Sequence, residues 1–202
     1  MNRARKSLRR DKRGFTGLEA AIVLTAFIVV AAVFSYVVLN AGFFTTQKSK
    51  EVIHTGVEQA TSSAELTGDV TGYGNTTTNK LTGVRFYLEL TAGERPLDLA
   101  TTTMAYTSEN THVGNVTYTA SITEDELKAG ASGDGSWSYT ILGSDGDSLL
   151  EKGEKAEISM ILPENGVAAN KRFSIEVKPA TGATIAVTRI APASIDAVMN
   201  LH

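Results

Sequence analysis

The amino-acid sequence predicts an α+β protein: a long hydrophobic N-terminal α-helix followed by an antiparallel β-sandwich or barrel of immunoglobulin-like kind. Three observations lead to this fold class. Residues 20–39 form a run of twenty residues without a charge. From residue 84 onward, short segments alternate apolar and polar side chains, and turn residues separate them. The 202 residues suffice for one such helix and one domain of ordinary size.

The apolar run predicts the first element. At about 1.5 Å per residue, a helix of this length spans about 30 Å, the thickness of a bilayer's hydrocarbon core. The run is apolar on every side, so it requires lipid or other apolar helices all around it. Residues 40–42 (Asn-Ala-Gly) interrupt it, but a thin apolar stripe at helical spacing follows through residues 52–64. We therefore expect one helix from Leu18 to about Ala64.

The charge of the chain is unevenly distributed. Residues 1–14 carry seven Lys or Arg and one Asp, a net charge of +6, so the remaining chain carries −9 of the total of −3. An acidic domain is a poor candidate for nucleic-acid binding. The positive-inside rule predicts a cytoplasmic N-terminus and export of the chain after Leu39. The chain has no cysteine, which excludes disulfides and thiolate zinc sites in the exported domain.

The junction between the basic leader and the apolar run has a distinctive pattern. Lys12-Arg13-Gly14 lies directly before Phe15, and a lone carboxylate, Glu19, lies at the start of the run. This pattern resembles the class III signal peptide of type IV pilins and archaeal flagellins. Two alternatives are a conventional secretory signal cut near residues 30–32 and an uncleaved anchor. The conventional signal predicts that the apolar run stops there, but the run continues to Leu39.

The rest of the chain predicts a β domain. The expected strands are 84–90, 97–106, 116–122, 136–142, 155–162, 172–178 and 183–190. Residues 124–128 suggest one helical turn, and residues 193–202 a short helix or tail. The expected divisions are a signal peptide over 1–14, a helix over 15–66, a Gly- and Thr-rich linker over 67–80 and an outer β domain over 81–202.

Three stretches carry a resemblance to one family. Arg13-Gly14-Phe15 with the following GLEAAIVL resembles the start of the archaellins, the archaeal flagellins that polymerise into the archaellum. Residues 149–158 (LLEKGEKAEI) are similar to a strand entry of that family, and residues 173–192 to its C-terminal hairpin. One position departs from the family, because many archaellins lack a glutamate where this chain has Glu19, which is a pilin-like feature.

The resemblance implies a structural filament subunit for swimming motility, either alone or mixed with sister archaellins. A prepilin-type signal peptidase would cut between Gly14 and Phe15 on the cytoplasmic side of the membrane. The helix would then leave the cytoplasmic membrane for the filament core, and the β domain would form the outer sheath of an extracellular filament at the cell surface. Two alternatives remain open: an adhesive type IV-like pilin, and a monomeric membrane-anchored domain that binds a ligand.

Glu19 is the predicted assembly residue. A charged carboxylate left unpaired in an apolar layer is costly. In the pilin-like arrangement, Glu19 meets the α-amine of Phe15 of its own or a neighbouring subunit, and the N-terminal end of its own helix also favours its charge. The alternative is an interfacial glutamate hydrated among lipid headgroups.

The exported part of the chain contains two N-glycosylation sequons, Asn75-Thr76-Thr77 and Asn115-Val116-Thr117. We expect glycans on Asn75 and Asn115, since sequons are modified in exported chains. Asn75 lies in the predicted Gly- and Thr-rich loop, and Asn115 lies just before a predicted strand.

The sequence predicts no catalytic, cofactor or metal site. The three histidines are scattered, and the chain contains no G-x-S-x-G, no nucleotide-phosphate loop and no H-E-x-x-H. Asp134, Asp145 and Asp147 lie in glycine-rich turns, but D-x-D without a complete calcium loop favours solvated turn aspartates over a Ca²⁺ site. We therefore expect a non-enzymatic protein.

Overall fold

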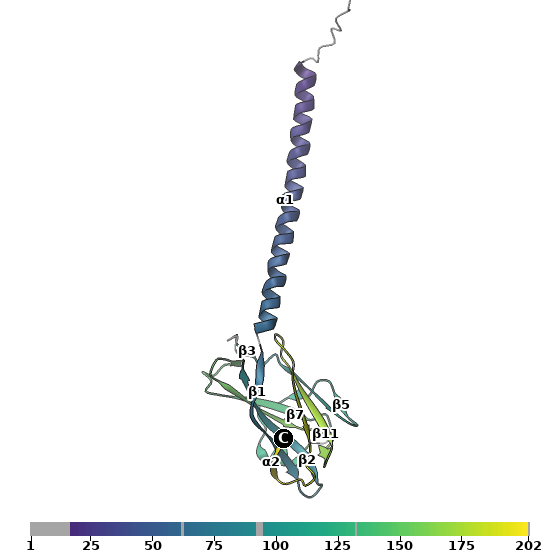
Figure 1. Cartoon of the computed structure of the whole chain (residues 1–202), viewed down its shortest axis with the longest axis vertical. Helices are drawn as coiled ribbons and strands as arrows, with labels where there is room; N and C mark the ends of the chain where they lie inside the picture. Colours follow the sequence, from purple (N-terminus) through teal and green to yellow (C-terminus); the bar gives the residue numbers. More distant parts are fainter. Residues whose placement is uncertain (1–16, 62, 92–94, 132, 202) are drawn as a thin grey trace, which may run out of the picture. The chain divides into compact units, whose positions relative to one another are not determined.

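The computed structural model describes residues 17–61, 63–91, 95–131 and 133–201. The chain divides into two compact units, Met1–Ile53 and His54–His202. Figure 1 shows both units.

Helix α1 extends over Gly17–Thr61, 45 residues or about 68 Å. The expected continuous helix is therefore confirmed, except that it ends at Thr61 and Ala64 already belongs to a strand. The helix continues through Gly42, which costs only about 1 kcal/mol relative to alanine. Thr45 and Thr46 lie one turn further on, and their hydroxyls donate to the carbonyls of Ala41 and Gly42, 2.8 Å away in each case. Their polar groups are thereby satisfied within the helix.

The larger sheet has seven strands, in the order β13-β1-β2-β9-β7-β6, with β10 pairing with β2. Their bounds are β1 Ala64–Asn75, β2 Lys80–Leu90, β6 Thr117–Tyr118, β7 Ser136–Leu142, β9 Lys155–Ile161, β10 Val167–Ala168 and β13 Val198–Leu201. Every pairing is antiparallel apart from that of the edge strand β6 with β7, which is parallel. Both edge strands, β6 and β13, are short, which limits unwanted strand pairing.

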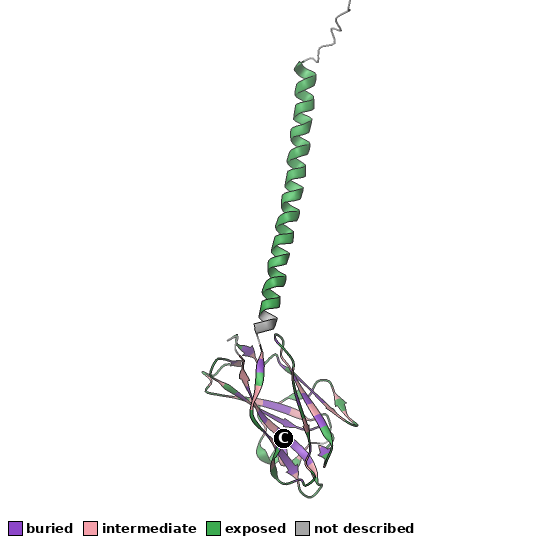
Figure 2. Ribbon diagram, in the orientation of Figure 1, coloured by how far each residue is buried: buried purple, intermediate pink, exposed green. Residues whose placement is uncertain are grey.

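The second sheet has four strands in the order β12-β11-β4-β5. These are β4 Thr103–Ser108, β5 His112–Val113, β11 Arg172–Lys178 and β12 Ile185–Ile190, while β3 Leu97–Asp98 pairs separately with β8 Leu149–Leu150. One buried cluster contains residues from both large sheets, including Phe86, Ile158, Tyr106 and Phe173. The expected antiparallel sandwich is confirmed, and alternating burial along its strands is visible in Figure 2.

The expectation of a linker over residues 67–80 is wrong, because most of this segment belongs to strand β1. Gly72 and Gly74 suggested a loop, yet they are required by packing. A Cβ atom on Gly72 would lie 2.8 Å from Leu81 Cδ1 and 3.1 Å from the δ-carbons of Leu201. The glycines therefore let neighbouring side chains pack on the backbone of the strand. The turn that connects β1 to β2 is confined to residues 76–79.

Three further expectations need correction. The expected helix or tail over 193–202 is wrong for the described residues 193–201, because β13 pairs with residues Val70–Tyr73 of β1 and buries Leu201. The expected strand 116–122 is reduced to the two residues of β6, and the expected strand 97–106 is divided between β3 and β4. Short edge strands carry little periodicity in sequence, so pairing with neighbouring strands determines where they form.

The expected helical turn after residue 123 is confirmed as α2, Glu124–Ala129. The Thr123 hydroxyl accepts from the Glu126 amide and the Glu126 carboxylate accepts from the Thr123 amide, a reciprocal capping box. These hydrogen bonds, the backbone one first, hold the pKa of Glu126 below its usual value. Leu127 packs with Tyr73 and Ile161 in a small cluster separate from the main core. Helix α2 therefore covers the face of the larger sheet that the sandwich core does not use.

Candidate assembly surface

Helix α1 exposes large apolar side chains along nearly its whole length, as the uniform colour of the helix in Figure 2 shows. They are Leu18, Ile22, Val23, Leu24, Phe27, Ile28, Val29, Val30, Val33, Phe34, Tyr36, Val37, Val38, Leu39, Phe43, Phe44, Val52, Ile53 and Val57. Soluble monomers rarely expose contiguous apolar patches beyond a few hundred Å². This surface must therefore be covered by lipid or by other proteins.

Two parts of α1 have different requirements. Among the described residues, one helix, over 17–57, is long and apolar enough to cross a membrane, judged by length and composition. The charge-free residues 20–39 alone fill about 30 Å of hydrocarbon. The section beyond them begins to carry charge, with a 2.7 Å ion pair between Lys48 and Glu51, yet it still exposes large apolar side chains. That section therefore presents charged and apolar side chains together on its surface.

Glu19 is an acidic residue in the first turn of α1, and its side chain is exposed. Its charge is favoured there by the partial positive charge at the N-terminal end of a helix. Gly14 and Phe15, the expected cleavage site, lie outside the described residues. The expected pairing of Glu19 with the amine of Phe15 therefore stays a prediction.

The two sequons lie at different places on the β domain. Asn75 ends β1, and its Oδ1 accepts from the amides of Thr77 at 3.0 Å and Thr78 at 3.2 Å. These bonds use the oxygen of the side-chain amide, so Nδ2, the atom that carries an N-linked sugar, takes no part in them. Asn115 is exposed in the segment between β5 and β6. Both geometries are compatible with modification.

The three turn aspartates are exposed, and Asp147 Oδ1 accepts from the Leu149 amide at 2.9 Å. Within the described ranges, no group of three or more His, Cys, Asp or Glu side chains is placed to hold a metal ion. His112 instead shares a 2.9 Å hydrogen bond with the Thr107 hydroxyl. The structure brings no candidate ligand set together from these residues.

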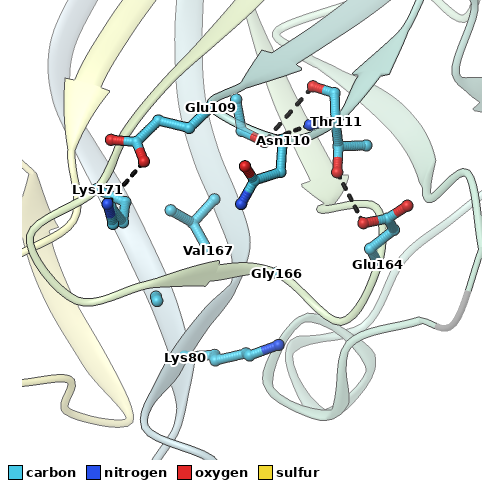
Figure 3. Close-up of a pocket in the computed structure, with 10 residues that line it drawn as sticks. Lys80, Glu109, Asn110, Thr111, Glu164, Gly166, Val167 and Lys171 are labelled. Atoms are coloured by element: carbon cyan, nitrogen blue, oxygen red, sulfur yellow. Dashed lines mark hydrogen bonds and ion pairs between the residues drawn. The ribbon is translucent and has the colours of Figure 1, made fainter.

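A polar cavity of about 190 Å³ lies between the β4–β5 hairpin and the β10 segment (Figure 3). Lys171 forms a 2.6 Å ion pair with Glu109, and the Thr111 hydroxyl donates to Glu164 at 2.7 Å. The lining is completed by Lys80, Ser108, Asn110, Gly166, Val167 and Ala168. Neither histidine nor cysteine is among the residues that line this cavity.

A network around Arg85 is the feature that sequence reasoning missed, since Arg85 reads only as an outward residue of an alternating strand. Its guanidinium lies 3.3 Å from Glu157 and 3.5 Å from Glu124, and it packs over the ring of Tyr73. Desolvation is the main reason that the pKa of Tyr73 is raised, and Arg85 opposes it. The network ties α2 to the sheet, a stabilising role that only the register of the strands reveals.

Fold and surface together define a class of protein: a β-sandwich domain joined to a long helix that exposes apolar side chains. Comparison with known proteins specifies the class. The chain belongs to the archaeal-type flagellin family, whose model matches residues 14–189. The family expectation from sequence is thereby confirmed.

Two relatives match along almost their whole length. "Probable flagellin 1" of Archaeoglobus fulgidus is 46% identical over 198 residues, covering 95% of this chain and 96% of the relative. "Probable flagellin 1" of Aeropyrum pernix is 37% identical over 197 residues, covering 92% and 95%. Among solved structures, the archaeal flagellum of Methanospirillum hungatei matches with a TM-score of 0.71 and 35% identity, covering 93% of this chain and 99% of that one. A flagellin from Methanocaldococcus jannaschii, 18% identical with a TM-score of 0.56, shares the fold and covers 69% of this chain and 96% of that one.

Proposed function

We propose that this protein is a structural subunit of the archaellum filament, that it polymerises through α1, and that the filament serves swimming. The observation that carries the proposal is the exposed apolar surface of α1. The similarity to a subunit of an assembled archaeal flagellum, which extends over 93% of the chain, supports it. In this proposal α1 lies in the filament core and the β-sandwich forms the outer sheath at the cell surface, without catalytic activity.

The energetics of assembly follow from the surface of α1. Moving the helix from lipid into a bundle of equally apolar helices gains little hydrophobic free energy. The free energy of assembly must therefore come mainly from close packing between helices. Small residues permit such packing, and α1 has alanines among its large side chains, at positions 20, 21, 26, 31 and 32. A close-packed core deforms little, and it can therefore transmit torque along the filament.

The N-terminus is proposed to be processed before assembly. A prepilin-type signal peptidase cuts after Gly14, which leaves space at the scissile bond, while the basic residues 1–14 hold the site at the cytoplasmic face of the membrane. The new α-amine of Phe15 pairs with Glu19, four residues ahead. In place of a separate linker, the mature subunit then consists of the helix from residue 15 to about 61 and the β domain from Ala64 onward.

The outer domain is proposed to carry N-linked glycans on Asn75 and Asn115. Both lie at the surface of the β domain, and neither side chain is needed in the core. Polar sugars on an acidic sheath limit lateral association of filaments, because they keep the surface hydrated and like-charged.

Deletion of the gene, with complementation from a plasmid, tests the function. The deletion strain should lose swimming and the rotating filament together, and the complemented strain should regain both. Sister flagellin genes are deleted in the same background, so that no other subunit can substitute. A deletion strain that swims normally but no longer adheres to surfaces would establish the adhesive pilin instead, and persistence of an uncleaved monomer at the membrane would establish the anchored domain.

A further inference from the structure

Asn75 has a charged neighbour on the adjacent strand. In the antiparallel ladder of β1 and β2, Asn75 lies directly opposite Lys80, and Lys80 in turn lies opposite Ala168 of β10. Residues opposite each other in such a ladder project from the same face, with Cβ atoms about 4.5–5.5 Å apart. A sugar on Nδ2 of Asn75 therefore emerges beside Lys80, whose side chain also lines the polar cavity together with Ala168.

Lys80 differs in its electrostatic environment from the other lysines of the β domain. Four of them, Lys128, Lys155, Lys171 and Lys178, form ion pairs with glutamates. Within the described part of the chain, no ion pair engages the ammonium of Lys80. Figure 3 shows this contrast: dashed lines reach Lys171 and Thr111, but none reaches Lys80. The chain after residue 14 carries a net charge of −9, so its carboxylates outnumber its cationic side chains.

We propose that Lys80 binds an acidic sugar of the glycan on Asn75, through an ion pair with its carboxylate or sulfate group. This inference rests on the proposed modification of Asn75. An ammonium carries three donors and a compact charge, which suit one anionic group and the hydroxyls around it. Because Lys80 lies directly beside the attachment site, the glycan is then held at two points: by its covalent bond to Asn75 and by its ion pair with Lys80.

The attachment point is held in place for such a contact. Two backbone amides, those of Thr77 and Thr78, fix the oxygen of the Asn75 side chain, so the side chain that bears the sugar has little freedom to lose. The glycan then lies along the β1–β2 turn over Lys80 instead of extending freely into solvent. The turn at residues 76–79 is shielded by this arrangement.

Lysine reactivity tests the contact on full-length protein purified from the producing cell. Wild type, Thr77→Ala and Thr77→Ser are treated with an amine-acetylating reagent, and the extent of labelling at each lysine is read by mass spectrometry of peptides. Thr77→Ala removes the sequon and Thr77→Ser keeps it. Lys80 should become several-fold more reactive in Thr77→Ala but not in Thr77→Ser. Lys155 and Lys178, half-exposed and distant in sequence from the sequon, should label equally in all three proteins.

Salt identifies the chemistry of the contact. In 1 M NaCl the Debye length is about 3 Å, so protection of Lys80 by an ion pair should largely disappear in wild type. The mass of the Asn75 glycopeptide should include an acidic sugar. If the glycan is detected on wild-type Asn75 but Lys80 is equally reactive in wild type and in Thr77→Ala, the contact with Lys80 is overturned and the modification of Asn75 stands. Protection that persists in high salt overturns the ionic contact, and an unmodified Asn75 in the wild-type protein overturns both proposals.

Discussion

Glu19 is the residue on which assembly most directly depends in the proposed mechanism. Its position in the first turn of α1 and its exposure place a carboxylate at the start of an otherwise apolar surface. Glu19→Gln should leave membrane insertion intact and reduce filament yield by tenfold or more, since the pairing with the Phe15 amine loses its charge. Electron microscopy and the ratio of filament to membrane-bound subunit measure this effect.

The control for Glu19 is a second exposed carboxylate on the same helix. Glu51→Gln removes a charge that is paired with Lys48 and exposed to solvent, so it should assemble at close to the wild-type level. Filament yield that falls equally in both variants would show that α1 simply needs its charges. Normal yield for Glu19→Gln would leave Glu19 as an interfacial residue.

The N-terminus of the assembled subunit provides a second test at this scale. Subunits from cell-surface filaments should begin at Phe15 and read Phe-Thr-Gly-Leu-Glu, because the peptide bond after Gly14 is the proposed cleavage site. Edman sequencing or mass spectrometry of the N-terminal peptide gives the answer. Filaments built from chains that still carry Met1 would contradict the proposed processing.

Tyr106 should make the free energy of unfolding fall as the pH becomes alkaline. Its side chain is 1% exposed in the core, and burial raises its pKa from 10.0 to about 12, against a smaller opposing effect of a hydrogen bond with Ser108. The raised pKa means that its contribution to stability is complete below about pH 10, where the unfolded tyrosine is still protonated, and is lost as the pH rises toward 12. At 1.36 kcal/mol per pKa unit, the loss is about 2–3 kcal/mol.

Tyr106→Phe should remove this part of the alkaline loss. Urea unfolding of the detergent-solubilised chain at pH 8 and pH 11 measures it, and the difference between the two pH values should shrink by about 1.4 kcal/mol in the variant, because pH 11 lies about one unit above the ordinary pKa of tyrosine. The buried tyrosine is replaced by a side chain of nearly equal size, so the protein should remain folded at pH 8. An unchanged pH dependence would refute the assignment to Tyr106.

At the scale of elements, β1 shows that its glycines serve packing. Gly72→Ala places a methyl group 2.8 Å from Leu81 Cδ1, inside the side-chain layer that β13 completes. We expect a destabilisation of about 1–3 kcal/mol, measured by urea unfolding, because overpacked cores must shift neighbouring groups. Gly114→Ala is the matched control, since its nearest atom lies at 3.8 Å and its stability should change by less than about 0.5 kcal/mol. If both variants change the free energy of unfolding by the same small amount, then packing does not require a glycine at position 72 of β1.

At the scale of the whole molecule, the two compact units have different roles. Residues 54–202 form a unit with their own core, while the apolar surface belongs mainly to residues 17–53. A variant that lacks residues 1–53 should therefore be a soluble monomer, whereas the mature chain should form filaments or require detergent. Sedimentation velocity without detergent distinguishes these states. A β domain that polymerises without α1 would contradict assembly through the helix.

The sequence by itself determined the features that depend on local composition. Twenty charge-free residues predict an apolar helix wherever they lie, and the alternation at residues 136–142 and 172–178 predicted strands that the structure reproduces residue for residue. The family followed from contiguous motifs at the start of α1 and in the last strands, which need no tertiary information. The position of Glu19 in the first turn of the helix likewise follows directly from its place in the sequence, just before the apolar run.

Only the tertiary structure decided the features that depend on a partner distant in sequence. Gly72 and Gly74 resemble loop glycines until Leu81, Leu201 and Ile195 are packed against them. The four residues of β13 carry too little pattern to predict a strand, and they become one because β1 offers an unpaired edge. Arg85 and Lys80 are ordinary strand residues in sequence. Cross-strand register alone places one within a polar network and the other beside Asn75, because pairing between strands is a long-range choice that local propensity does not encode.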